Sequence, residues 1–159
     1  MKLLIFSDSH GSEELLAKAV GDNLNADGYI FLGDGERDFE YALSLYSIYP
    51  YGDKTKEVYQ VRGNCDMFSK ERDSIVADIC GHRIFITHGS SQAVKRGIER
   101  LALEASQIGC DVALFGHTHE RFHGENQGVT LFNPGSLRSG SYGVLTLGNN
   151  RVELIWKNI

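Results

Sequence analysis

Short apolar runs alternate with longer amphipathic stretches along this chain. The runs have the length of buried strands, and they span 3–6, 29–32, 58–61, 75–79, 83–87, 112–115, 129–132, 143–147 and 152–156. Three other stretches, 12 to about 24, 38 to about 45 and 92 to about 107, read as helices, and the first and third carry apolar residues at helical spacing. Strands alternating with helices, followed by a strand-rich end, predict an α/β fold whose sheet strands pair in mixed directions.

Local signals predict where several of these elements begin and end. Ser12 is a candidate N-cap, because its hydroxyl can accept a hydrogen bond from the first turn of a helix. Gly109 is expected to end the third helix. Gly81-His82 lies between two apolar runs and indicates a hairpin, and Asn149-Asn150 predicts the last turn.

The length of 159 residues and the absence of a linker predict a single domain over residues 1–159. No stretch approaches the ~20 apolar residues of a membrane span, and the first apolar run is too short for a signal peptide. The cysteines are odd in number and form no CxxC pair, which argues against a disulfide framework or a thiolate zinc site. We therefore expect a cytoplasmic protein without a membrane partner.

The net charge of the chain limits the kinds of molecule that it can be expected to bind. The net charge is −5, and no run of Lys and Arg occurs, so strong nucleic-acid binding is not expected. An acidic chain can still bind a small phosphate ester if bound cations reverse the local field. The sequence does not decide whether the protein is a homo-oligomer.

Polar clusters follow five of the predicted strands. The five segments read LLIFSDSH, YIFLGD, YQVRGNCD, RIFITHG and VALFGHTH. In open α/β sheets, ligands bind outside the carboxyl ends of the strands, so these clusters are expected to meet at one edge. The side chains concerned are Asp8, His10, Asp34, Asn64, His88, His117 and His119.

Each cluster alone has an ordinary structural interpretation. A lone histidine such as His88 is more often a hydrogen-bonded core residue than a ligand, and Gly63-Asn64 is a common turn pair. His117 and His119, one residue apart at a strand end, are a stronger signal. Together the clusters favour a metal site of imidazole nitrogens and oxygens, which suits manganese, iron or zinc. A closed, purely structural zinc site would have four ligands, often including cysteine.

The motifs D-x-H, GD, GN-x-D, H-G and GH-x-H, between Asp8 and His119, resemble the signature of the calcineurin-like metallophosphoesterases. The small size, the GNCD form of the third motif and the sequence NPGS at 133–136 resemble the small bacterial and archaeal phosphodiesterase branch, the YfcE/MJ0936-like group. That branch is related to the retromer subunit Vps29. The resemblance implies a two-sheet β-sandwich flanked by helices in α-β-β-α layers.

The resemblance also implies two divalent metal ions. Asp8, His10 and His119 match the ligands of one ion, and Asn64, His88 and His117 match those of the other. Asp34 matches the carboxylate that bridges both, and we count it among the catalytic residues. Manganese is the expected metal, with iron, zinc and nickel as alternatives.

The implied activity is hydrolysis of a phosphate ester, first of all a phosphodiester, by in-line attack of a metal-bridging hydroxide. A phosphomonoesterase or a nuclease on the same fold is one alternative, and the net charge of −5 disfavours the nuclease. The other is a non-catalytic, metal-binding interaction module of the Vps29 kind. In such a module degraded ligand positions would be expected, and all the matching positions are intact here.

One position departs from many relatives. Where they have a histidine that is thought to protonate the leaving oxygen, with the next aspartate orienting it, this chain has Cys65 followed by Asp66. We therefore name Cys65 and Asp66 as candidate catalytic residues. A thiol is a poorer acid for this step, so the sequence predicts a preference for good leaving groups such as aryl esters.

Overall fold

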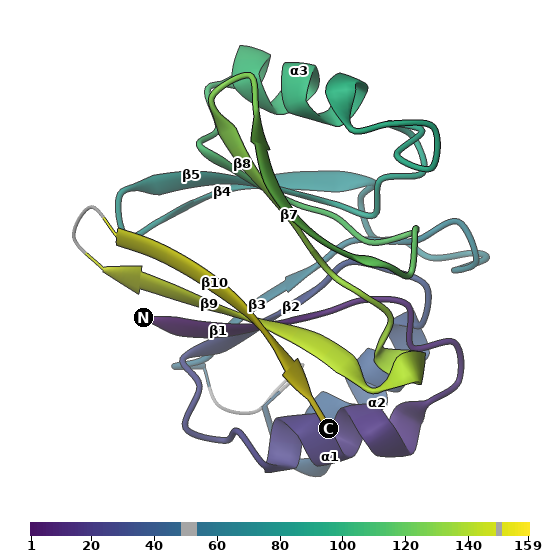
Figure 1. Ribbon diagram of the computed structural model, residues 1–159. Helices are drawn as coiled ribbons and strands as arrows, with labels where there is room; N and C mark the ends of the chain where they lie inside the picture. The colour runs from purple at the N-terminus through teal and green to yellow at the C-terminus, as the bar shows by residue number, and fades with distance from the viewer. Residues whose placement is uncertain (49–53, 149–150) are drawn as a thin grey trace.

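A computed structural model describes residues 1–48, 54–148 and 151–159. Two five-stranded sheets lie face to face, with helices on their outer faces, as Figure 1 shows. The predicted α-β-β-α layers are therefore confirmed. The strands pair in mixed directions within each sheet, as the alternating pattern predicted.

The first sheet has the strand order β10-β9-β1-β2-β3. Its strands are β1 (Lys2–Phe6), β2 (Gly28–Phe31), β3 (Glu57–Gln60), β9 (Ser141–Gly148) and β10 (Arg151–Asn158). Strands β1, β2 and β3 are parallel, whereas β9 is antiparallel to both β1 and β10. The carboxyl ends of β1, β2 and β3 therefore share one edge.

The second sheet has the order β4-β5-β6-β8-β7. Its strands are β4 (Ser74–Ile79), β5 (His82–Thr87), β6 (Val112–Leu114), β7 (Arg121–Asn126) and β8 (Val129–Pro134). Strands β5, β6 and β8 are parallel, and β4 forms a hairpin with β5. The carboxyl ends of β5 and β6 thus lie at one edge as well.

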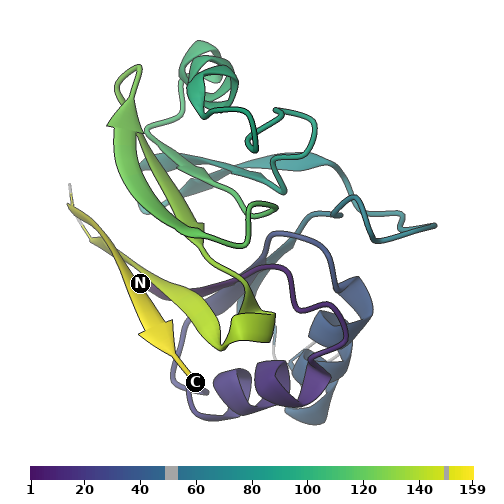
Figure 2. The same ribbon diagram turned by 45° about the vertical axis from the view of Figure 1, so that its right-hand side comes forward.

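Helices α1 (Glu13–Gly21) and α2 (Glu36–Leu45) cover the outer face of the first sheet, and α3 (Glu99–Ile108) covers that of the second. The view in Figure 2 shows the same layers with the right-hand side of Figure 1 brought forward. A short 3₁₀ helix, η1 (Leu137–Ser139), precedes β9.

Strand β1 shows why its sequence is an unbroken apolar run. Leu3 and Ile5 belong to the core between the two sheets, whereas Leu4 and Phe6 belong to the core beneath α1 and α2. Because successive side chains of a strand point to opposite faces, a strand that is buried on both faces has no polar position. A third core lies between the second sheet and α3.

One predicted helix cap and one predicted helix start differ from the structure. The Ser12 side chain makes no capping hydrogen bond, although α1 starts at the next residue. Helix α3 starts at Glu99 rather than at residue 92, because the backbone before it has positive φ values of 56° at Ala93 and 148° at Gly97. Val94 is buried against the third core from this turn region, which explains its helical spacing in the sequence.

The other boundary signals had mixed outcomes. Gly109 ends α3 in the left-handed region with φ 81°, as predicted. The hairpin turn is at Cys80 and Gly81, and His82 already belongs to β5. Strand β7, in which polar residues dominate, was not predicted. The predicted turn at Asn149-Asn150 lies outside the described residues.

Among the described residues no helix is both long and apolar enough to cross a membrane. Cys65, Cys80 and Cys110 are free thiols.

Candidate metal centre

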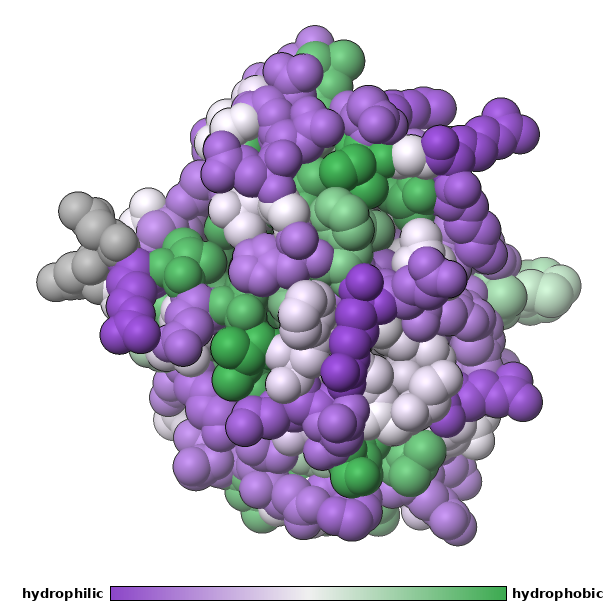
Figure 3. All heavy atoms as spheres, viewed as in Figure 1, coloured by the Kyte–Doolittle hydropathy of each residue, from purple (hydrophilic) through white to green (hydrophobic). Residues whose placement is uncertain are grey.

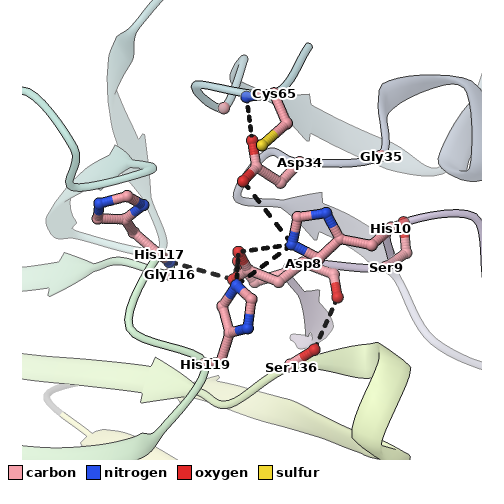
Figure 4. Close-up of polar contacts among 12 residues, drawn as sticks. Asp8, Ser9, His10, Asp34, Gly35, Cys65, Gly116, His117, His119 and Ser136 are labelled. Atoms are coloured by element: carbon pink, nitrogen blue, oxygen red, sulfur yellow. Dashed lines mark hydrogen bonds and ion pairs between the residues drawn. The ribbon is translucent and has the colours of Figure 1, made fainter.

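The loops after β1, β2, β3, β5 and β6 meet at one end of the sandwich (Figure 1), and Figure 4 shows residues of the loops after β1, β2, β3 and β6. They bring together all the predicted ligands: Asp8 and His10 after β1, Asp34 after β2, Asn64 after β3, His88 after β5, and His117 and His119 after β6. The first sheet thus supplies the carboxylates and the amide, and the second sheet supplies most of the imidazoles.

Asp8, His10 and His119 form the first cluster (Figure 4). The Nε2 atom of His119 is 3.1 Å from Asp8 Oδ1 and 3.2 Å from His10 Nε2. Asp8 is fully buried, and its Oδ1 has no hydrogen-bond partner among the described residues. A buried carboxylate oxygen that accepts no hydrogen bond is costly even within 3.1 Å of the His119 ring, and a cation between these three side chains would satisfy it.

Asp34, His88 and His117 form the second cluster. The Nε2 atom of His88 is 3.4 Å from Asp34 Oδ2 and 3.1 Å from Asn64 Oδ1. The Nδ1–H of His88 donates to the carbonyl oxygen of Leu32 at 2.7 Å. This bond leaves Nε2 of the neutral ring free to bind a metal, which is the usual arrangement around metal-binding histidines.

Asp34 lies between the two clusters. Its Oδ2 is 3.8 Å from His10 Nε2 on one side and 3.4 Å from His88 Nε2 on the other. The backbone N–H of Cys65 donates to the other oxygen, Oδ1, at 2.7 Å. The position of Asp34 suits a carboxylate shared between two cations, and the whole donor set fits borderline divalent metals.

Hydrogen bonds also shift pKa values at this site. Burial alone would raise the pKa of Asp34, but hydrogen bonds from His88 and from the Cys65 amide hold it well below its ordinary value. Burial opposes the charged form of His88, yet Asp34 and Asp8 raise its pKa overall. Burial, together with the nearby His88, lowers the pKa of His117.

The backbone around the ligands is unusual. Positive φ values occur at five of the candidate ligands: Asp8, His10, Asp34, His117 and His119. Such values are uncommon outside glycine, and they cluster where a fold must aim side chains at a site. This backbone strain marks the candidate site in the structure, and the sequence did not reveal it.

The end of β8 and the loop that follows it support the first cluster. Ser136 donates its Oγ–H to the carbonyl oxygen of Asp8 at 2.8 Å, and Asn133 Nδ2 donates to the carbonyl oxygen of Gly116 at 2.8 Å. The backbone N–H of His117 donates to Asp8 Oδ2 at 3.1 Å. These contacts tie the loops of β1 and β6 together, so the sequence NPGS acts on the site through other residues.

The Asp66 carboxylate is occupied by hydrogen bonds, unlike a catalytic carboxylate that is free to contact a substrate. It accepts hydrogen bonds from four backbone N–H groups, those of Asp34, Gly35, Glu36 and Gly63, at 2.8–3.0 Å. The loop after β3 is thereby joined to the start of α2. Cys65, next to it, is exposed, and its Sγ is 3.3 Å from Asn64 Nδ2. Burial and the neighbouring Asp34 raise the pKa of the Cys65 thiol.

A cavity of about 490 Å³ opens beside the first cluster. Its walls include His10, Asp34 and Cys65, as well as side chains that the sequence did not single out. Among the latter are Glu36, Arg37, Met67 and Phe68. An open cavity that borders the candidate ligands could hold the organic part of a substrate.

Comparison with known proteins then decides the family. The profile of the calcineurin-like phosphoesterase superfamily domain matches residues 1–149. The chain belongs to this superfamily. The family resemblance seen in the five motifs is therefore confirmed.

Two relatives place this calcineurin-like phosphoesterase more closely. It is 32% identical to the probable metallophosphoesterase YsnB of Bacillus subtilis over 158 residues, which cover 94% of this chain and 86% of YsnB. It is 30% identical to the phosphodiesterase MJ0936 of Methanocaldococcus jannaschii over 158 residues, covering 93% of this chain and 91% of MJ0936. The resemblance to the small phosphodiesterase branch is thus confirmed.

Solved structures share its fold. A predicted phosphoesterase of Streptococcus pneumoniae superposes with a TM-score of 0.80 at 19% identity, covering 99% of this chain and 88% of that one. The Vps29 of Entamoeba histolytica, solved with zinc, superposes with a TM-score of 0.71 at 16% identity, covering 99% of each chain. At these identities the likeness concerns the fold of this calcineurin-like phosphoesterase.

Proposed function

We propose that this protein is a phosphodiesterase that depends on two divalent metal ions. The observation that carries the proposal is the position of Asp34, between a cluster of Asp8, His10 and His119 and a cluster of His88 and His117. Two cations held by clusters that share one carboxylate form the arrangement used in in-line phosphoryl transfer to water. The likeness to a phosphodiesterase of an archaeon supports the choice of diesters.

The proposed ligands are Asp8, His10 and His119 for one ion and Asn64, His88 and His117 for the other, with Asp34 shared. Their nitrogen and oxygen donors suit manganese, which we propose first, and equally admit iron, zinc or nickel. Bound cations of this kind supply a hydroxide nucleophile near neutral pH and neutralise charge on the phosphate. The site would remain positive, because only two carboxylates face two divalent ions, and it would attract an anionic ester.

The chain's own groups would position the reaction. The Cys65 N–H holds Asp34 from one side, and the Leu32 carbonyl holds the His88 ring from the other. The Cys65 thiol is exposed at the cavity wall, so it is the proposed donor of a proton to the leaving oxygen. Asp66 positions that loop through the backbone hydrogen bonds it accepts. We place the reaction in the cytoplasm, where a thiol stays reduced.

The test compares hydrolysis of bis-p-nitrophenyl phosphate with that of p-nitrophenyl phosphate. Metal-stripped protein is assayed with and without added manganese, for the wild type, Asp34→Asn and the control Asp78→Asn. Asp78 is an exposed carboxylate that pairs with Arg83 on the hairpin of β4 and β5. Diester cleavage that needs manganese and is lost only in Asp34→Asn is the expected result.

The other outcomes separate the alternatives. Faster cleavage of the monoester than of the diester would make the protein a phosphomonoesterase. If the folded wild type cleaved neither ester with manganese, iron, zinc or nickel, the catalytic proposal would be wrong. A metal-binding interaction module of the Vps29 kind would then be the better description.

A further inference from the structure

Two large apolar side chains project into solvent beside the candidate metal centre. Phe68 is 94% exposed and Met67 is 74% exposed, whereas no other large hydrophobic residue in the described part of the chain exceeds 52%. The segment between β3 and β4 projects on the right of Figures 1 and 2, and an apolar protrusion lies at that edge of Figure 3. An exposed apolar pair beside a candidate site is a candidate for contact with a ligand.

The exposure is built into an ordered loop. The Met67 N–H donates to the Cys65 carbonyl at 2.9 Å, and the Ser69 N–H donates to the Asp66 carbonyl at 3.2 Å. The Asp66 carboxylate fixes the base of the same loop to α2. Phe68 has φ 66°, a left-handed conformation that is uncommon for an aromatic residue. The backbone therefore holds the Phe68 ring out of the core at some energetic cost.

The loop forms one wall of the cavity that opens beside the metal cluster. Met67 and Phe68 line that cavity together with the candidate ligands His10 and Asp34. A group attached to a phosphate at the metals would thus meet an apolar wall. The exposed guanidinium of Arg37 lines the same cavity and adds a positive charge.

The carboxylates of the cavity differ in what they can still bind. Asp38 accepts hydrogen bonds from Ser9 Oγ at 2.6 Å and from the Gly11 N–H at 2.8 Å, so its Oδ2 is occupied. Asp66 is occupied by backbone N–H groups. Glu36 also lines the cavity, and its Oε2 is buried without a hydrogen-bond partner among the described residues. If the side chain turned toward the cavity, a ligand with N–H donors would satisfy this oxygen.

We infer that the cavity receives the base of a nucleotide, so that the substrate is a phosphodiester with a nucleoside as one of its two ester groups. This inference rests on the proposed phosphodiesterase function. The base would stack on the Phe68 ring and contact the Met67 thioether, and its N–H groups would donate to Glu36. A nucleobase combines a flat π-face with N–H donors, whereas an alkyl chain offers neither and a sugar lacks the flat face.

The experiment uses two diesters that share one leaving group. They are the p-nitrophenyl ester of guanosine 5′-monophosphate and ethyl p-nitrophenyl phosphate, assayed with manganese-loaded protein. The readout is the ratio of kcat/KM for the guanosine ester to kcat/KM for the ethyl ester. We expect a ratio of about 10 or more for the wild type. Phe68→Ala should lower this ratio at least about fivefold, because the loss of stacking between one base and an aromatic side chain weakens binding by at least about that factor.

Three variants sharpen the result. Phe68→Trp keeps a stacking face and should retain the ratio. Glu36→Gln weakens the acceptor and should lower the ratio. Leu103→Ala, an exposed apolar residue of α3 that does not line this cavity, should leave the ratio unchanged. Because Phe68 is almost fully exposed, none of its variants should impair folding.

The outcomes distinguish this inference from the proposed function. If the wild type hydrolysed neither ester, the phosphodiesterase proposal itself would fail, and the base site with it. If it hydrolysed both esters with a ratio near one, or if Phe68→Ala left the ratio unchanged, the base site would be wrong while the phosphodiesterase function stood. An unchanged ratio in Glu36→Gln would likewise overturn the assignment of a nucleobase.

Discussion

At the scale of single residues, the Asp66 carboxylate illustrates how a motif position can act without touching the chemistry. It accepts hydrogen bonds from backbone N–H groups of two loops, after β2 and after β3. Those loops carry Asp34 on one side and Asn64 and Cys65 on the other. In relatives the matching aspartate is thought to orient the acid, and here its contacts orient the backbone that carries Cys65.

Asp66→Asn should therefore weaken both stability and metal binding. The amide can accept fewer of these bonds and brings two donors of its own toward backbone N–H groups. We expect the free energy of unfolding to fall by about 1–3 kcal/mol, the usual cost of unpaired buried donors, and the affinity for manganese to fall as well. Urea unfolding and calorimetric titration measure the two effects. Unchanged stability would show that these hydrogen bonds contribute little.

Cys65 carries a second prediction at this scale. A thiol near two cations is a poor general acid, so hydrolysis should depend steeply on how well the ester oxygen leaves. We expect kcat/KM for a p-nitrophenyl diester to exceed that for the matching phenyl diester by about 10²-fold or more, because general acid catalysis normally supplies about that factor. Equal turnover of alkyl and aryl diesters would show that an efficient acid is present.

At the scale of elements, the glycines before Asp34 and Asn64 allow the loops after β2 and β3 to pass close together. A Cβ atom on Gly63 would lie 2.1 Å from Asp34 Oδ1 and 2.4 Å from the Asp34 nitrogen. The first of these contacts is with the proposed bridging carboxylate, and the second is with the backbone of Asp34. Neither neighbour can move without displacing the candidate metal site.

Gly63→Ala should thus destabilise the protein by about 1–3 kcal/mol, the range for overpacking, and should reduce manganese affinity. Gly148→Ala is the matched control, because a Cβ atom there would meet no atom of the described residues within 4 Å. Thermal unfolding with and without metal would separate the two variants. Equal behaviour of Gly63→Ala and the control would mean that the loops can move apart freely.

The elements also show what the sequence could and could not predict. Apolar runs such as Leu3–Phe6 identify buried strands, and the polar residues that follow them identify the site, because a strand's direction fixes where its end lies. The start of α3 was predicted too early. Buried Val94 fits the helical pattern, but the positive φ value of Gly97 does not allow a helix to continue there. Phe68 gave no sign of its role, because exposure depends on loop geometry that residue type does not encode.

At the scale of the whole molecule, the candidate metal centre joins the two sheets. Asp8, Asp34 and Asn64 follow strands of the first sheet, and His88 and His117 follow strands of the second. The sheets are also held together by the apolar core between them and by hydrogen bonds such as that from Trp156 to the Asn133 carbonyl and that from Arg121 to Ser141. Metal ions bound to both sheets would therefore cross-link the layers of the sandwich.

Metal removal should consequently lower the stability of the entire fold. A ligand that binds only the native state stabilises it by RT ln(1 + [L]/Kd), which is about 2.7 kcal/mol at a free concentration of 100 Kd. For a domain of this length we expect the midpoint of thermal unfolding to fall by roughly 5–15 °C on treatment with a chelator, and to recover when manganese is added back. Asp34→Asn should lose most of this dependence, because its carboxylate serves both proposed ions, whereas Asp78→Asn should keep it. If chelation left the unfolding midpoint of the wild type unchanged, the cation sites would not join the two sheets. The close approach of their loops would then depend on hydrogen bonds between them, such as that from His88 to the Leu32 carbonyl.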